Sequence, residues 1–151
     1  MLLYRVGAGV YARSLSGEGA RLYGGRWNPK GVPVLYLAEH PALACLEFLA
    51  GVDPALLADG QATLLVLDAP FTKAQIETVQ RLPQDWAQEP ASPSTQAVGQ
   101  AWCQAGRKPL LRVPTIHVPQ AFNYVLNVQH PLAAQLRVVQ AAPFALSGRL
   151  L

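Results

Sequence analysis

Short apolar runs separated by glycine and proline dominate the hydrophobic pattern of this sequence. Apolar runs of about four to eight residues, bounded by turn-forming residues, are typical of buried β-strands. The predicted strands cover residues 2–6, 34–38, 62–67, 110–113, 115–118 and 135–141.

Three further segments carry the signals of helix ends. Pro41 suits a first helical turn and Gly51 suits a helix end. Thr72 and Gln75 have the spacing of a capping box, and the third segment lies between a capping serine and a glycine. The predicted helices cover residues 40–50, 72–82 and 94–105.

The intervening residues, 7–28 and 83–93, are predicted loops, and the first of them is rich in glycine. Strands and helices are mixed without strict alternation, which favours an α+β fold over a doubly wound parallel sheet. The predicted architecture is a single compact domain over residues 1–151, with mixed or antiparallel sheets and short flanking helices.

The composition supports a packed domain with many turns. Hydrophobic residues make up 51% of the chain and charged residues 14%, which is the opposite of the balance in disordered proteins. Thirteen prolines and twelve glycines argue against an all-helical bundle. The net charge is only +3 and no run of Lys or Arg occurs, so no direct contact with nucleic acid is predicted.

The cysteines and histidines do not have the spacing of metal ligands. Cys45 and Cys103 form no paired motif, and His40, His117 and His130 are scattered, so no metal site is predicted. The first residues turn polar at once, unlike a secretory signal, and no apolar stretch is long enough to span a membrane. The prediction is a cytoplasmic protein with reduced thiols and no membrane contact.

Glu47 is the only charged residue between Pro41 and Val52. A nearly all-apolar helix is normally buried, and a carboxylate on it is costly unless it is paired or used. Two interpretations stay open. The residue is either a single solvent-facing charge or a carboxylate in a partly desolvated cleft, where its hydrogen bonding can be tuned.

Arg26 follows two glycines and precedes Trp27. The glycines let the backbone approach a ligand closely, and the guanidinium offers a forked donor to phosphate or carboxylate. Trp27 offers a flat apolar wall, although a surface arginine stacked on it is the alternative. Arg5, inside the first predicted strand, suits an anion site, an ion pair or an edge-strand charge.

Tyr36 lies in the strand that precedes the Glu47 helix. It is either a core residue or, at a cleft, a stacking surface for a flat heterocycle. Phosphate-binding glycine motifs and the nucleophilic-serine motif are absent from the sequence. Together these residues predict an anion-binding, aromatic-walled cleft with one carboxylate, which is compatible with a nucleotide-type substrate.

Three ordered blocks of the sequence resemble the RES domain family, whose members are the toxins of bacterial toxin–antitoxin pairs. The resemblance covers nearly the full chain. The matching segments are GGRWNPKGVPVLYLA at 24–38 with ALACLE at 42–47, AVGQAW at 97–102, and LRVPT at 111–115 with NYVLN at 123–127 and the pair His130-Pro131.

The resemblance implies an ADP-ribosyltransferase-like fold and a reaction that cleaves the bond between nicotinamide and ribose of NAD, with ADP-ribose passed to phosphate or water. NAD is then the substrate, and neither a cofactor nor a metal is implied. The implied catalytic residues are Glu47, Arg26, Tyr36 and Thr115, the last standing where the family has serine. The implied NAD-binding residues are Arg5, Arg26, Trp27, Asn28, Tyr36 and Asn123.

The resemblance also implies a protein partner. This is an Xre-type helix-turn-helix antitoxin, through which any DNA contact would run, and self-association of the toxin within the complex is expected. Two other functions stay open: transfer of ADP-ribose to a specific cellular protein, and nucleotide binding by a catalytically weak module.

Overall fold

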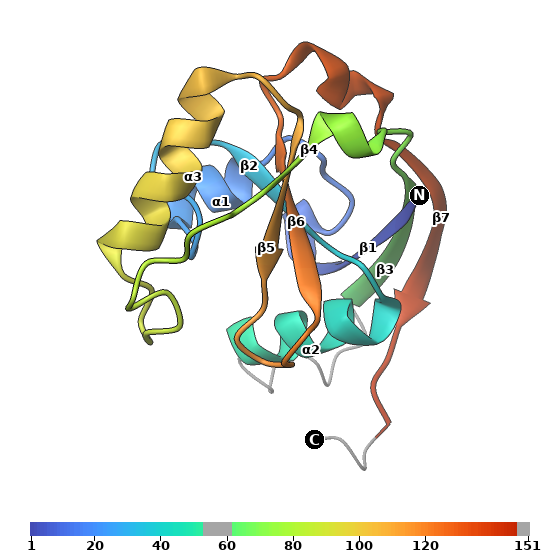
Figure 1. Cartoon of the computed structure of the whole chain (residues 1–151). Coiled ribbons are helices and arrows are strands. Elements are labelled where there is room, and N and C mark those ends of the chain that lie inside the picture. Colours follow the sequence, from blue (N-terminus) through green and yellow to red (C-terminus); the bar gives the residue numbers. More distant parts are fainter. Residues whose placement is uncertain (53–61, 148–151) are drawn as a thin grey trace.

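One mixed sheet runs through the molecule in the computed structural model, which describes residues 1–52 and 62–147 (Figure 1). Its described strands are β1 (Leu2–Ala8), β2 (Val34–Ala38), β3 (Ala62–Asp68), β4 (Ile76–Thr78), β5 (Leu110–Pro114), β6 (Phe122–Asn127) and β7 (Arg137–Phe144). The strand order is β4-β5-β6-β2-β1-β3-β7. β4 and β5 pair in parallel, whereas the other neighbours are antiparallel.

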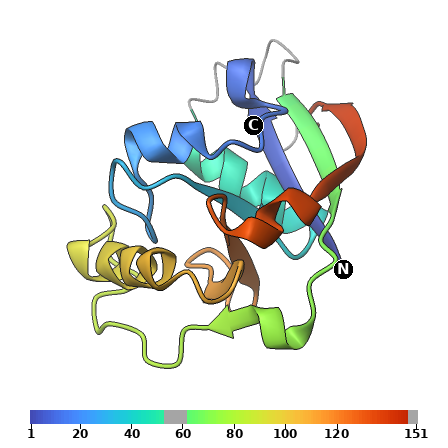
Figure 2. The same ribbon diagram turned by 90° about the horizontal axis from the view of Figure 1, so that it is seen from above.

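Three α-helices of the described residues flank this sheet. They are α1 (Glu18–Tyr23), α2 (Pro41–Gly51) and α3 (Pro93–Ala105), and the 3-10 turns η1 (Gly9–Tyr11), η3 (Lys73–Gln75) and η4 (Pro131–Gln135) complete the architecture. Viewed from above, α1 and α3 lie at one end of the molecule, and β3 and β7 lie at the other (Figure 2). None of the helices in the described part of the chain has both the length and the apolar character needed to cross a bilayer.

The central strands β2, β5 and β6 are largely buried on both faces, which explains their apolar runs in the sequence. Successive side chains of a strand point to opposite faces. On β2, Val34 packs with Trp27 and Trp102 on the α3 side, whereas Leu35 and Leu37 pack into the larger core on the other face. The predicted α+β class with a mixed sheet is therefore confirmed.

Several predicted elements are confirmed with small shifts at their ends. The strands predicted at 2–6, 34–38, 62–67, 110–113 and 135–141 correspond to β1, β2, β3, β5 and β7. The helix predicted from residue 40 is α2, whose N-cap His40 accepts the Ala42 N–H on its ring nitrogen at 3.1 Å. The helix predicted from residue 94 begins at Pro93, because Ser92 takes the N-cap position.

The helix predicted over 72–82 is wrong. The capping box of Thr72 and Gln75 is present, but it closes the single turn η3. The chain then enters β4, where Ile76 pairs with Leu110 of β5 and packs against the core. β-branched residues favour a pleated, half-buried surface, and here pairing with a neighbouring strand outweighs the local cap.

The strand predicted over 115–118 is also wrong, since the chain turns there and Gln120 has a positive φ of 68°. The strand lies further on as β6, which the sequence did not signal because asparagines interrupt its apolar pattern. β6 nevertheless pairs with both β5 and β2, and its inner residues Tyr124, Val125 and Leu126 are buried.

The loop predicted over 7–28 contains the short helix α1, which the sequence pattern also missed. A bidentate pair between Glu18 and Arg21, three residues apart, supports this helix. Gly17 begins it with φ 72°, and a Cβ there would lie 2.8 Å from the Val34 carbonyl oxygen. Glycine is therefore required where α1 meets β2.

Candidate active site

A cavity of about 610 Å³ opens beside β2. β1 and β2 are paired at a single position, Tyr4 with Ala38, so β2 is free of β1 along most of its length. A second cavity of about 280 Å³ between these strands and α2 shares part of the same wall. Seven of the predicted site residues line the larger cavity: Arg5, Arg26, Trp27, Tyr36, Glu47, Thr115 and Asn123.

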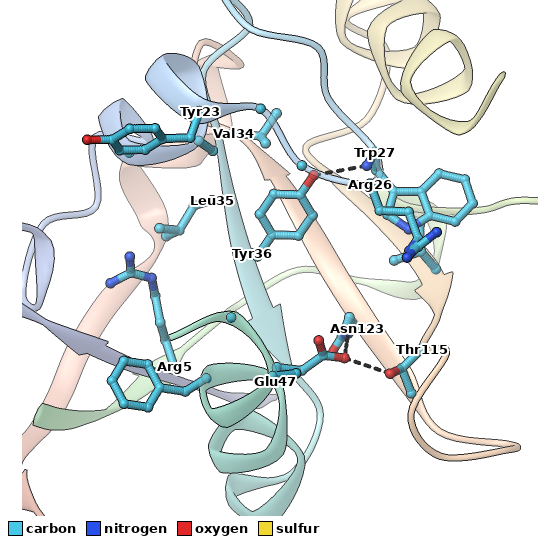
Figure 3. Close-up of a pocket in the computed structure, with 18 of the residues that line it drawn as sticks. Arg5, Tyr23, Arg26, Trp27, Val34, Leu35, Tyr36, Glu47, Thr115 and Asn123 are labelled. Atoms are coloured by element: carbon cyan, nitrogen blue, oxygen red, sulfur yellow. Dashed lines mark hydrogen bonds between the residues drawn. The ribbon is translucent and has the colours of Figure 1, made fainter. Parts of the chain in front are cut away.

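Glu47 projects from α2 into the wall of this cavity (Figure 3). Its Oε1 atom accepts hydrogen bonds from Thr115 Oγ1 and Asn123 Nδ2, each at 2.6 Å. Its Oε2 atom lies 3.5 Å from His117 Nε2, and the Glu47 side chain is 34% exposed. The carboxylate therefore belongs to a polar cluster at the cavity, as in the cleft interpretation of the sequence.

Two side chains from separate segments of the chain orient the Glu47 carboxylate. Thr115 follows β5 and is buried, and its Oγ1 also accepts the backbone N–H of His117 at 3.2 Å. Asn123 lies on β6, and its Oδ1 atom is buried without a hydrogen-bond partner among the described residues. The geometry keeps one oxygen of Glu47 fixed and leaves the other less constrained.

Tyr36 lies between this cavity and the turn at residues 24–28, in which Trp27 and Asn28 are buried. Its hydroxyl donates to Asn28 Oδ1 at 2.6 Å and accepts the Trp27 backbone N–H at 3.0 Å (Figure 3). Burial raises the pKa of Tyr36 far above its ordinary value, because the phenolate would be desolvated. A Cβ on Gly25 would lie 2.7 Å from the Tyr36 hydroxyl, so glycine is needed for this approach.

Asn28 is the one predicted site residue that does not line the cavity. Its side chain is fully buried beneath Tyr36, and its amide nitrogen donates to the carbonyl oxygens of Ala20 at 2.9 Å and Val32 at 3.0 Å. Trp27 reaches the cavity wall but is only 2% exposed, because its indole packs in the core. Both residues thus hold the turn in place beneath the cavity.

The two predicted arginines both line the cavity, but they differ in the partners of their guanidinium groups. Arg5 Nη1 donates to the Tyr11 carbonyl oxygen at 3.1 Å, and Arg5 makes no ion pair within residues 1–52 and 62–147. Burial lowers the pKa of Arg5 from its ordinary value. Arg26 is already engaged by the loop after β4: it donates to the carbonyl oxygens of Trp86 and Gln88 and pairs with Glu89, each at 2.8 Å.

The assembled wall suits a ligand that carries both anionic and hydroxyl groups. Arg5 contributes a half-buried positive charge that has no carboxylate partner among the described residues, and Glu47 contributes a carboxylate fixed at one oxygen. The described residues contain no group of three His, Cys, Asp or Glu side chains that could hold a metal ion. Sequence reasoning missed His117, whose one available signal was its position two residues after Thr115.

Comparisons with known proteins show the family of this chain. The RES domain family model matches residues 2–147. Similar curated proteins are "Toxin Res" of Photorhabdus laumondii, 36% identical over 99% of this chain and 97% of that protein, and "Prs ADP-ribosylating toxin" of a Sphingobium species, 34% identical over 93% and 88%. "NAD(+) phosphorylase MbcT" of Mycobacterium tuberculosis is 54% identical over 39 residues, 25% of this chain and 20% of that protein.

A solved structure extends the similarity to the whole fold. The crystal structure of the M. tuberculosis MbcT–MbcA toxin–antitoxin complex contains a chain that matches 95% of this chain and 84% of its own length. The TM-score is 0.76 at 25% sequence identity. The similarity therefore extends over nearly the whole fold of this chain.

Proposed function

Because the chain belongs to the RES domain family, we propose that it is the toxin of a bacterial toxin–antitoxin pair and consumes NAD. The proposed reaction breaks the bond between C1′ of the ribose and the nicotinamide nitrogen. The bonding electron pair leaves with nicotinamide, whose ring charge is thereby neutralised, and positive charge develops on the ribose. ADP-ribose then passes to phosphate or water, which forms a new C1′–O bond; where water is the acceptor, it releases one proton to the solvent.

The observation that carries this proposal is the Glu47 carboxylate at the cavity, with Oε1 fixed by Thr115 and Asn123. A positioned carboxylate stabilises an oxocarbenium-like ribose, as carboxylates do in glycoside hydrolysis. Because Oε1 is already oriented, little reorganisation is needed when the charge develops. This electrostatic assistance requires neither a metal nor a further cofactor, and NAD enters as the substrate.

We assign the pyrophosphate of NAD to Arg5. Its guanidinium lines the cavity and has no carboxylate partner in the described part of the chain. Arg26 faces the same cavity, but its donors already hold the 86–89 loop. Tyr36 offers its ring to the nicotinamide, and Asn28 and Trp27 act indirectly by fixing that ring.

The acceptor of ADP-ribose separates two versions of the proposal. Similarity to an NAD(+) phosphorylase supports phosphate, whereas the longer match to an ADP-ribosylating toxin favours a protein acceptor as the second candidate. Incubation of the protein with labelled NAD and a cell extract distinguishes them, because only the second candidate labels a protein band. Nucleotide binding without NAD loss would instead support a catalytically weak module.

We further propose an antitoxin partner, in line with the toxin–antitoxin complex that this fold matches. We expect an Xre-type protein that covers the cavity and carries any DNA contact, with self-association of the toxin inside the complex. Co-expression of the protein from the neighbouring reading frame should relieve growth arrest and co-purify with this chain. Growth arrest that persists despite co-expression would contradict this partner.

The central test compares NAD loss by purified wild type with loss by Glu47→Gln, with and without phosphate. The amide keeps an acceptor for Thr115 but removes the negative charge, so the rate should fall about 10²–10³-fold. Glu77→Gln is the matched control, because Glu77 lies on β4 and lines neither cavity. Full activity of Glu47→Gln would overturn the mechanism, and acceleration of the wild type by phosphate would identify phosphorolysis.

A further inference from the structure

The turn after β5 contacts both oxygens of the Glu47 carboxylate. Thr115 Oγ1 donates to Oε1 at 2.6 Å, and the backbone N–H of His117 donates to that same hydroxyl at 3.2 Å. The imidazole of His117 then reaches the other side of the carboxylate, with Nε2 3.5 Å from Oε2. His117 is therefore coupled to Glu47 through its backbone and through its side chain.

The two carboxylate oxygens of Glu47 differ in how many further hydrogen bonds they can accept. A carboxylate oxygen has about two lone-pair sites, and both sites of Oε1 are used by Thr115 and Asn123. Oε2 lies 3.5 Å from the His117 Nε2 atom, and both side chains are partly exposed, His117 by 26% and Glu47 by 34%. Oε2 is thus the atom of Glu47 that is open to the substrate, and His117 is next to it.

Among the described residues, Glu47 is the charged group that pairs with His117. The other charged groups of the elements around it have partners of their own or stack on a ring. Glu89 pairs with Arg26, Glu18 pairs with Arg21, Arg5 is bound to the Tyr11 carbonyl oxygen, Glu39 accepts the Phe122 N–H, and Arg112 stacks on the Phe122 ring.

We propose that His117 is a positioning residue whose protonation switches the charge that Glu47 presents to the ribose. Neutral His117 leaves the carboxylate charge available at Oε2. Protonated His117 forms an ion pair with Oε2, which cancels that charge and adds a positive charge close to the developing oxocarbenium ion. This inference rests on the proposed NAD cleavage and adds its dependence on pH.

The effect should fall on kcat and leave KM nearly unchanged. Positive charge on the ribose develops in the transition state, so an interaction that opposes it alters catalysis more than substrate binding. Histidine changes its charge between roughly pH 5 and 8. NAD cleavage should therefore slow as the pH falls through this range.

The test measures kcat and KM for NAD from pH 5 to pH 8.5 in the wild type, His117→Gln and His117→Lys. Wild-type kcat should fall about tenfold or more toward the acid end. His117→Gln has a neutral side chain and should lose this acid limb, with kcat at pH 8 lowered less than about fivefold. His117→Lys imitates the protonated state and should have kcat about tenfold or more below wild type at every pH.

His130→Gln is the matched control, because His130 caps η4 and lines neither cavity. Its pH profile should follow that of the wild type. An unchanged acid limb in His117→Gln, or wild-type kcat in His117→Lys, would overturn the inference while leaving NAD cleavage intact. A wild type that consumes no NAD at any pH would overturn the proposed function, and this inference with it. Melting temperatures of the variants verify that all of them are folded.

Discussion

Two walls of the same cavity are built in opposite ways. In the tryptophan turn (residues 24–28), Trp27 and Asn28 are buried, and the Asn28 amide is saturated with hydrogen bonds to three backbone carbonyls and to Tyr36. In the Glu47 cluster (Glu47, Thr115, His117 and Asn123), the Glu47 and His117 side chains are partly exposed, and one oxygen of the Glu47 carboxylate is not saturated.

This difference separates residues that shape a site from residues that react in it. A saturated, buried polar group has no capacity left for a ligand, and removing one partner leaves the others unsatisfied. A partly exposed group with spare capacity can exchange water for substrate. Changes in the tryptophan turn should therefore cost stability, and changes in the Glu47 cluster should cost activity in a protein that still folds.

The largest expected effect comes from Gly99→Ala, which tests whether the tryptophan turn is rigid. Gly99 is buried on α3, and a Cβ there would overlap the carbonyl oxygen of Trp27 and lie 2.7 Å from its carbonyl carbon. The collision is with backbone, so relief requires α3 or the turn to move. We expect a loss of at least about 4 kcal/mol in unfolding free energy, measured by urea denaturation.

The control for this change is Ala97→Gly, at an exposed position of the same helix. It should lower the unfolding free energy by about 1 kcal/mol, because glycine has a lower helix propensity than alanine. A Gly99→Ala protein as stable as the wild type would mean that the turn yields easily, and the contrast between the two walls would fail.

Asn28→Ala is expected to have the next largest effect. It removes the partner of the Tyr36 hydroxyl and of three backbone carbonyls inside the protein. Each buried group left without a partner is costly, so unfolding free energy should fall by about 2–4 kcal/mol. Urea denaturation measures the loss, and NAD consumption per folded molecule should fall far less than in Glu47→Gln.

Asn123→Ala is the matching change in the Glu47 cluster, and it tests the same difference between stability loss and activity loss. It removes one donor to a partly exposed carboxylate, so its stability loss should be smaller and its loss of activity larger than in Asn28→Ala. If the two asparagine variants showed the same ratio of stability loss to activity loss, the distinction between the walls would be wrong.

The sequence correctly predicted those helices and strands whose signals lie within the element itself or at its ends. α2 follows from Pro41, Gly51 and the apolar run between them, and β2 follows from a bounded apolar run. β4 and β6 were not predictable in this way, because their conformations depend on pairing with β5. The capping box at Thr72 is real, but a local cap does not determine how far a helix continues.

The same distinction holds at the site. The isolated charge of Glu47 and the glycines before Arg26 predicted parts of the cavity wall correctly. Such signals can be recognised in the sequence, because an unusual residue type differs from its immediate neighbours. The buried role of Asn28 was not visible, since its partner Tyr36 lies on another element. The partners of Arg26 are about 60 residues away, Trp86 being at a separation of 60, and no local pattern reports such contacts.

Tyr36→Phe changes the residue that lies between the tryptophan turn and the cavity. It should lower the unfolding free energy by about 1–3 kcal/mol, because Asn28 Oδ1 and the Trp27 N–H lose their partner. The effect should also depend on pH. The pKa of Tyr36 is raised in the folded state, so the stabilisation is complete below about pH 10, where both states are protonated. Above that pH the unfolded state releases its proton first, and stability falls.

The stability difference between wild type and Tyr36→Phe should therefore shrink by about 1 kcal/mol between pH 10 and pH 11, with a slope that approaches about 1.4 kcal/mol per pH unit at higher pH. Urea denaturation of both proteins at pH 8, 10 and 11 provides the measurement. The other tyrosines are present in both proteins, so their ionisation cancels in the comparison. A difference that stays constant with pH would mean that the Tyr36 hydroxyl ionises freely in the folded protein.

The smallest expected effect is that of Thr115→Ser, which introduces the hydroxyl residue of the family pattern into the Glu47 cluster. Serine keeps the donor to Glu47 Oε1 and the acceptor for the His117 N–H, so NAD consumption should stay within about threefold of wild type. Loss of the buried methyl group should lower unfolding free energy by about 1 kcal/mol. Thr115→Val keeps the shape but removes the hydroxyl, and it should lower kcat about tenfold because Oε1 loses one of its two donors. Equal activity of the serine and valine variants would show that Asn123 alone orients Glu47, and the cluster would then depend on one hydrogen bond in place of two.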